Sequence, residues 1–156
     1  PLEAPPPLNA GFRIQRRFLN LQGKPVNLQQ VPQGEVLVVL LEGKADSKDL
    51  DHQALIVDPL AAGLEIESPQ LAKSRSISDL GWLGDLSTAL YMDGLDDRFV
   101  AALDLLGEER EFRLAYLVRA VTPGTYRLPP TEVEDMYSPR YRARGDSGTL
   151  VVVPAR

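Results

Sequence analysis

The chain has 156 residues, 44% of them apolar, and its 22 acidic side chains outnumber 17 basic ones to give a net charge of −5. This length suits one domain with a real core, and the acidic balance argues against a nucleic-acid partner, because phosphate backbones are bound by clustered Lys and Arg. The sequence has no cysteine, so it excludes disulfides, thiolate metal sites and a cysteine nucleophile.

The N-terminal segment is rich in proline, with Pro1 followed by prolines at positions 5–7. Such a run forms a semi-rigid spacer of the polyproline type. We therefore expect residues 1–10 to be an interdomain linker and residues 11–156 to be a single domain. Because the chain opens on Pro1 without a signal peptide, we also expect it to be a piece of a longer protein.

Alternation of apolar and polar residues predicts strands along most of the chain. Phe12, Ile14 and Phe18 fall on one face of the first predicted strand, and Arg13, Gln15 and Arg17 fall on the other. Residues 36–41 are apolar on both faces, which predicts a central strand between two covered surfaces and is far too short for a membrane span. Further strands are predicted at residues 26–28, 54–57, 99–105, 112–120 and 149–153.

The predicted fold class follows from this pattern. Seven or more strands are separated by Gly, Pro and Asp turns, and no stretch of helix length is amphipathic. We therefore predict an all-β, antiparallel β-sandwich of the immunoglobulin-like kind. In two neighbouring strands, the apolar positions predicted to face the core are Phe99, Ala101, Leu103 and Leu105, and Phe112, Leu114, Tyr116, Val118 and Ala120.

Residues 74–90 interrupt the strand pattern. Ser78 is placed to cap a short helix that runs through Leu86, but Gly81 and Gly84 each lower helix stability by about 1 kcal/mol relative to alanine. We expect an irregular excursion with at most two helical turns. Trp82, the only tryptophan, is predicted to plug one end of the core.

Residues 145–148 have the sequence GDSG, which matches the surroundings of the nucleophile in trypsin-like peptidases. Serine catalysis requires a histidine base and a carboxylate behind it. His52 is the only histidine and sits at the start of a predicted strand, and only eight residues follow Gly148. We therefore predict a glycine-rich hairpin turn, no catalytic residues and no enzymatic activity.

Two short motifs have simpler explanations than ligand binding. Residues 144–146, RGD, spell the tripeptide that integrins recognise, but they precede the predicted turn. Asp93, Asp96 and Asp97 cluster in a loop, yet their spacing lacks the alternating acidic positions of a calcium loop. We predict solvated turns in both places, with no metal site and no cofactor.

Three longer segments carry a family resemblance. Residues 115–130 have the sequence AYLVRAVTPGTYRLPP and are followed at 133–139 by VEDMYSP. Residues 55–69, LIVDPLAAGLEIESP, and 96–102, DDRFVAA, add to it. In this order they resemble the C-terminal macroglobulin-like domain of bacterial alpha-2-macroglobulins, large periplasmic proteins that trap peptidases. The resemblance covers roughly positions 50–140 and implies the macroglobulin form of the β-sandwich.

The resemblance also implies a role for Met136 and Tyr137. Both match a Met-Tyr pair which, in members with a Cys-Gln thioester in a separate domain, packs over that bond and shields it from water. From the residues alone, a thioether beside an aromatic ring after a Pro-Pro segment is usually core filler. Both interpretations, interdomain lid and core filler, are open at the level of sequence.

The resemblance implies a non-catalytic domain that packs against the thioester domain, or its equivalent, until a peptidase cuts a bait region elsewhere in the parent protein. Its partners would be the neighbouring domains and, through the whole protein, the target peptidases. A periplasmic penicillin-binding protein is a further candidate, because some family members are associated with one. The implied location is the periplasm, with the parent anchored to the inner membrane. The alternative is a free-standing immunoglobulin-like binding module of the cell envelope.

Overall fold

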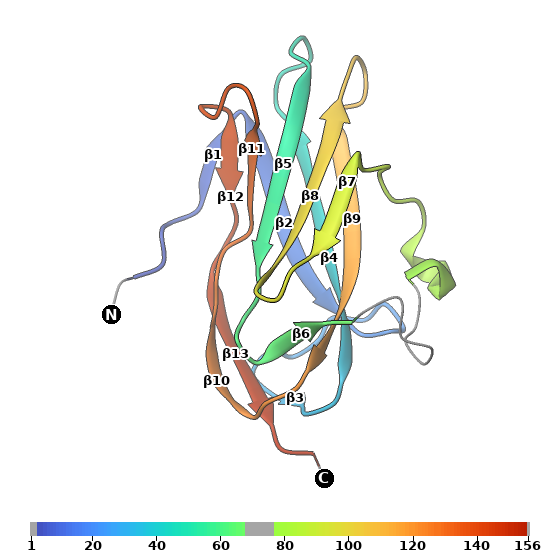
Figure 1. Ribbon diagram of the computed structural model, residues 1–156, viewed down its shortest axis with the longest axis vertical. Helices are drawn as coiled ribbons and strands as arrows, with labels where there is room; N and C mark the ends of the chain where they lie inside the picture. The colour runs from blue at the N-terminus through green and yellow to red at the C-terminus, as the bar shows by residue number, and fades with distance from the viewer. Residues whose placement is uncertain (1–2, 68–76, 156) are drawn as a thin grey trace.

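The structure is a computed structural model that describes residues 3–67 and 77–155. The strands within these residues form three sheets. The six-stranded sheet has the order β1-β12-β11-β5-β8-β7. Its strands are β1 (Leu8–Ala10), β12 (Arg142–Arg144), β11 (Glu132–Asp135), β5 (His52–Pro59), β8 (Arg98–Leu105) and β7 (Tyr91–Gly94). The expected all-β sandwich is confirmed, and Figure 1 shows this sheet lying over a second layer.

The second layer is a four-stranded antiparallel sheet in the order β2-β4-β9-β6. Its strands are β2 (Phe12–Leu19), β4 (Val36–Ala45), β9 (Glu111–Ala120) and β6 (Leu64–Ile66). A small third sheet, β10-β13-β3, extends one end of the molecule (Figure 1). It contains β10 (Gly124–Leu128), β13 (Gly148–Val153) and β3 (Val31–Pro32). β13 pairs with β3 in parallel, the one departure from antiparallel pairing among the described strands.

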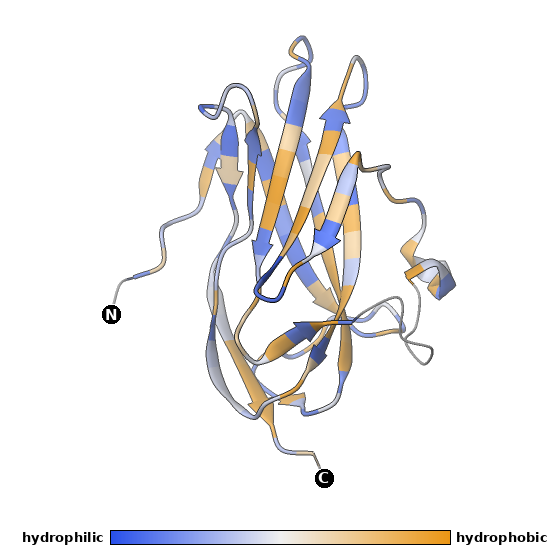
Figure 2. Ribbon diagram, in the orientation of Figure 1, coloured by the Kyte–Doolittle hydropathy of each residue, from blue (hydrophilic) through white to orange (hydrophobic). Residues whose placement is uncertain are grey.

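The inner faces of the sheets form the core and confirm the predicted strand phase. Phe99 and Leu103 of β8 and Tyr116 and Val118 of β9 are all buried in the main apolar cluster. Residues of β8 alternate between buried and more exposed from Arg98 to Leu105, while Figure 2 shows that apolar residues predominate along this strand. A one-residue shift would have turned each of these side chains to the opposite face.

β4 is central, as predicted from its two apolar faces, because it pairs with β2 on one side and β9 on the other. Its inward side chains join the main core, while Val38 and Leu40 point to the outer face. There Leu80 and Leu83 cover them in a second apolar cluster. These two leucines come from the excursion, which contains two short 3-10 turns, η1 (Ile77–Asp79) and η2 (Gly81–Leu83). Residues 74–76 of the predicted excursion lie outside the described residues.

Four details of the sequence prediction change. Trp82 does not plug the core: it is 36% exposed, donates from Nε1 to the carbonyl of Leu21 at 2.7 Å and lies over Gly23. Residues 26–28 form no strand. Residues 145–148 are not a hairpin turn, because β12 and β13 pair with different strands. β1 pairs with β12 from Leu8 onward, three residues before the expected start of the domain.

No helix in residues 3–67 or 77–155 is long and apolar enough to cross a membrane.

Candidate functional site

Residues 136–141 connect β11 to β12 at one end of the six-stranded sheet. The loops that join β4 to β5 and β8 to β9 lie at the same end, the top of Figure 1. Here Met136 is 45% exposed and Tyr137 is 79% exposed. Neither side chain belongs to the core, so the core-filler interpretation of this pair is wrong for this chain.

The backbone beneath this exposed pair is held by several hydrogen bonds. Oδ1 of Asp135 accepts the amide N–H groups of Tyr137 and Ser138, both at 2.8 Å. The amide of Met136 donates to the carbonyl of Gln53 on β5 at 2.9 Å. The amide of Asp135 donates to the carbonyl of Tyr141 at 2.9 Å and closes the base of the loop. The loop is therefore ordered by its backbone, while the side chains of Met136 and Tyr137 face solvent.

The second carboxylate oxygen of Asp135 connects the loop to the interior. Oδ2 lies 2.6 Å from Nδ1 of His52, the buried first residue of β5. The imidazole packs between the rings of Phe12 and Tyr141, with centroid separations of 4.7 and 5.3 Å. Burial by itself would raise the pKa of Asp135, but the hydrogen bonds from His52 and from the two loop amides outweigh it and lower that pKa.

His52 is thus brought together with Asp135, not with Ser147 of the GDSG sequence. No other hydrogen bond of the ring is made within the described part of the chain. Sequence reasoning had no signal for this contact, because the two residues are 83 positions apart and each has a common alternative role. Asp51, the sequence neighbour of His52, instead accepts the amide of Gly107 at 2.9 Å.

A second buried polar cluster ties the two layers together. Nη1 of Arg16 on β2 lies 2.6 Å from Oδ1 of Asp58 on β5, and the Tyr116 hydroxyl on β9 donates to the other oxygen of Asp58. Nη2 of Arg16 also donates to the carbonyl of Pro129 at 2.7 Å. Burial raises the pKa of Asp58, although Arg16 and Tyr116 partly offset it, and burial likewise raises the pKa of Tyr116 well above its ordinary range.

This cluster was not predicted from the sequence. A perturbed carboxylate is a candidate for catalysis when it opens onto a cleft. The side chains of Asp58 and Arg16 are only 1% and 5% exposed, and the Tyr116 ring stacks on Phe99 at 4.3 Å. The arrangement therefore supports a structural role, in which hydrogen bonds link the two layers inside the sandwich.

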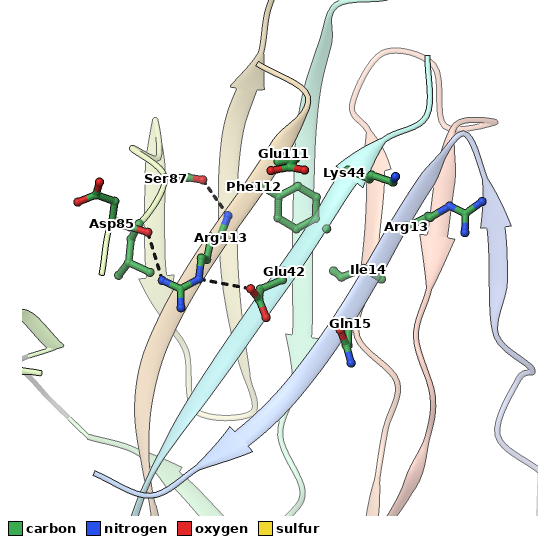
Figure 3. Close-up of a pocket in the computed structure, with 12 residues that line it drawn as sticks. Arg13, Ile14, Gln15, Glu42, Lys44, Asp85, Ser87, Glu111, Phe112 and Arg113 are labelled. Carbon is green, nitrogen blue, oxygen red and sulfur yellow. Dashed lines mark hydrogen bonds and ion pairs between the residues drawn. The ribbon is translucent and has the colours of Figure 1, made fainter. Parts of the chain in front are cut away.

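A hollow of about 600 Å³ lies on the outer face of the four-stranded sheet, over β2, β4 and β9 (Figure 3). Among its charged lining residues, Glu42 and Arg113 pair with each other. Glu42 pairs with Arg17 at 2.7 Å and with Arg113 at 3.3 Å. Arg113 also donates to the carbonyls of Leu83 and Asp85. These contacts hold residues 83–85 against the sheet.

The remaining sequence motifs are involved in local contacts. Arg144 of the RGD sequence pairs with Glu132 at 2.8 Å and donates to the carbonyl of Pro6. Asp93 accepts a hydrogen bond from the Tyr91 hydroxyl at 3.0 Å, and Asp97 pairs with Arg98 at 3.5 Å. Within residues 3–67 and 77–155, no group of three His, Asp or Glu side chains is placed to hold a metal ion.

A family model and several curated proteins match this chain. The model of the bacterial alpha-2-macroglobulin MG10 domain matches residues 11–140. The chain is 39% identical to alpha-2-macroglobulin of Escherichia coli and 38% identical to that of Xylella fastidiosa, over 98% and 93% of its own length. It covers 10% and 9% of those proteins, so it spans about a tenth of the curated relatives it matches.

Solved structures agree with this result. A crystal structure of trypsin-activated alpha-2-macroglobulin from Escherichia coli superposes with a TM-score of 0.85 at 38% identity, over 97% of this chain and 11% of that one. A Salmonella alpha-2-macroglobulin reacted with methylamine gives a TM-score of 0.82 at 40% identity, over 99% of this chain and 10% of that one. The motifs, the sandwich and these matches together identify the chain as a member of the bacterial alpha-2-macroglobulin MG10 domain family.

Proposed function

We propose that this chain is a non-catalytic domain of a bacterial alpha-2-macroglobulin, and that Met136 and Tyr137 pack against the thioester domain of the parent, or its equivalent, until bait cleavage separates them. One observation supports this most strongly: a Met and a Tyr are held in solvent on an ordered loop. Burying such side chains against another surface releases apolar area from water, which is the main driving force for association.

The physical purpose of such a contact would be to exclude water. A thioester hydrolyses when it is wet, so an apolar cover keeps it reactive until the cover is removed. An interface that must open is moderate in area and partly polar. The polar backbone of residues 136–141 beside two apolar side chains fits that description. This chain has no cysteine, so any thioester belongs to another part of the parent.

Family membership and the tenfold greater length of the relatives favour this function over a free-standing immunoglobulin-like binding module. Trapping of peptidases would be an activity of the whole parent. A periplasmic location, an inner-membrane anchor and a penicillin-binding protein as partner are further parts of this proposal that follow from the family alone. Cell fractionation and co-purification of the full-length parent test these three points.

The experiment compares Tyr137→Ala with Tyr91→Ala in the full-length parent. Tyr91 is a matched control, because it is also exposed, at 53%, and lies on the edge strand β7. In a parent with a thioester, Tyr137→Ala should speed methylamine incorporation before any peptidase is added, and Tyr91→Ala should not. In a parent without the bond, Tyr137→Ala should weaken the protection of this domain's loop against amide exchange. Equal behaviour of the two variants would contradict the proposal.

A further inference from the structure

We infer that His52 and Asp135 are positioning residues. They hold the loop 136–141, before any neighbouring domain binds, in the conformation in which Met136 and Tyr137 can contact that domain. The inference rests on the proposed function of Met136 and Tyr137. It adds two residues that make no part of the exposed surface themselves, since both are buried. They act by fixing the backbone that carries the pair.

The two oxygens of the Asp135 carboxylate have different partners. Oδ1 accepts two consecutive amides, those of Tyr137 and Ser138, at 2.8 Å each. One acceptor shared by adjacent N–H groups fixes the turn at residues 135–138, as aspartate commonly does in such turns. Oδ2 points the other way, toward His52 at 2.6 Å. The carboxylate therefore links the turn to the sandwich interior.

Residue 52 is a histidine, although packing alone does not require one. Its ring fills space between Phe12 and Tyr141, a task that an apolar ring would perform equally well. The hydrogen bond to Asp135 is the one polar contact that the ring makes to the described residues. An ionised carboxylate only accepts, so we assign the proton to Nδ1. The donor to Asp135 is then what distinguishes His52 from a simple packing residue.

Ordering of the loop in advance favours binding to a neighbouring domain. Association loses free energy when a mobile loop must be ordered at the interface, and a loop ordered in advance avoids most of that loss. Met136 is also tied to β5 through Gln53, so the loop has a second anchor. Removing the Asp135 acceptor should release residues 137 and 138 while leaving the rest of the sheet paired.

The experiment measures amide hydrogen exchange in this chain for Asp135→Ala, Asp135→Asn and His52→Leu, with Asp51→Ala as the matched control. Asp51 accepts the amide of Gly107 in the neighbouring loop, and in the described part of the chain it makes no hydrogen bond or ion pair to residues 136–141. Asp135→Ala should raise the exchange rates of the Tyr137 and Ser138 amides at least about tenfold. His52→Leu should raise them less, and Asp135→Asn should restore most of the protection, because its amide oxygen still accepts. Asp51→Ala should leave both amides unchanged.

Exchange of the β4 and β9 amides, which report the centre of the sheet, separates loop release from unfolding of the whole chain. If Asp135→Ala unfolds the chain, the other two variants test the inference. The Tyr137 and Ser138 amides should then exchange faster in His52→Leu than in the unsubstituted chain and stay largely protected in Asp135→Asn. Unchanged Tyr137 and Ser138 exchange in a folded Asp135→Ala or His52→Leu variant would overturn the inference.

The same variants in the full-length parent separate this inference from the proposed function. If Tyr137→Ala weakens interdomain protection and Asp135→Ala does not, the contact is real and the positioning role is wrong. If neither variant changes the parent, the proposed function fails, while the exchange results on this chain still show whether His52 and Asp135 order the loop.

Discussion

At the scale of single residues, the contacts between buried polar side chains could not be predicted from the sequence. Arg16, Asp58 and Tyr116 come from three strands of two sheets, and His52 meets Asp135 across 83 positions. Each residue by itself gives no indication of its partner, because the contact forms only when the strands come together in the folded chain. By contrast, Met136 and Tyr137 were identified because a contiguous motif carries them.

Tyr137→Ala in this chain should change the free energy of unfolding by no more than about 0.5–1 kcal/mol. The reason is that Tyr137 is 79% exposed, so removing its ring leaves no cavity. Urea titration monitored by Trp82 fluorescence measures the change. A loss of roughly 3 kcal/mol or more, the cost of deleting a buried ring, would mean that the side chain packs within this domain.

The two buried carboxylates should titrate on opposite sides of their common ordinary pKa of 3.8. The pKa of Asp135 is lowered, so its contribution to stability is present above the unfolded pKa and is lost as the pH falls through the folded value. Burial raises the pKa of Asp58, so its cost is relieved as the pH falls through that raised value.

Carboxyl-carbon NMR of Asp58 and Asp135 between pH 7 and pH 2 checks both signs. The Tyr137 and Ser138 amides should also lose protection as Asp135 takes up its proton, because a protonated carboxyl is a weaker acceptor. Titration of Asp135 above Asp58 would contradict the hydrogen bonding described here.

At the scale of elements, the long strands could be predicted, whereas the short strands and the connections could not. Period-two alternation placed the inward faces of β8 and β9, because that pattern is a direct consequence of strand geometry. The two apolar faces of β4 required a cover on both sides. Sequence did not show that Leu80 and Leu83 provide the outer cover, nor that Trp82 stays on the surface, since an irregular segment has no repeating geometry.

Leu103→Ala should lower the free energy of unfolding by about 2–5 kcal/mol, because Leu103 lies in the main core at 2% exposure. Gln15→Ala is the control, an exposed position on β2 with an expected change of about 0.5 kcal/mol or less. Arg113→Ala is less suitable as a control, since Arg113 holds residues 83–85 to the sheet. Chemical denaturation of the three proteins gives the comparison, and similar midpoints for Leu103→Ala and Gln15→Ala would refute the strand phase.

At the scale of the whole molecule, the chain belongs to a domain family whose curated relatives are about ten times its length. The fold class and the family could be predicted because the motifs cover most of the sandwich. The interdomain role could not be derived from the fold, since many sandwiches serve unrelated functions. It depends on two exposed side chains and on what covers them in the parent.

Hydroxyl-radical footprinting of the full-length parent tests that central claim most directly. The chain has two methionines, and each is next to a tyrosine in sequence. Met136 and Tyr137 form one pair; Met92 and Tyr91, each 53% exposed on the edge strand β7, form the other. Both pairs should be modified rapidly in this chain alone. In the uncleaved parent, Met136 and Tyr137 should be protected, and cleavage by a peptidase should restore their reactivity. If Met136 and Tyr137 react as fast in the uncleaved parent as in the isolated chain, no neighbouring domain covers them and the proposed function is wrong.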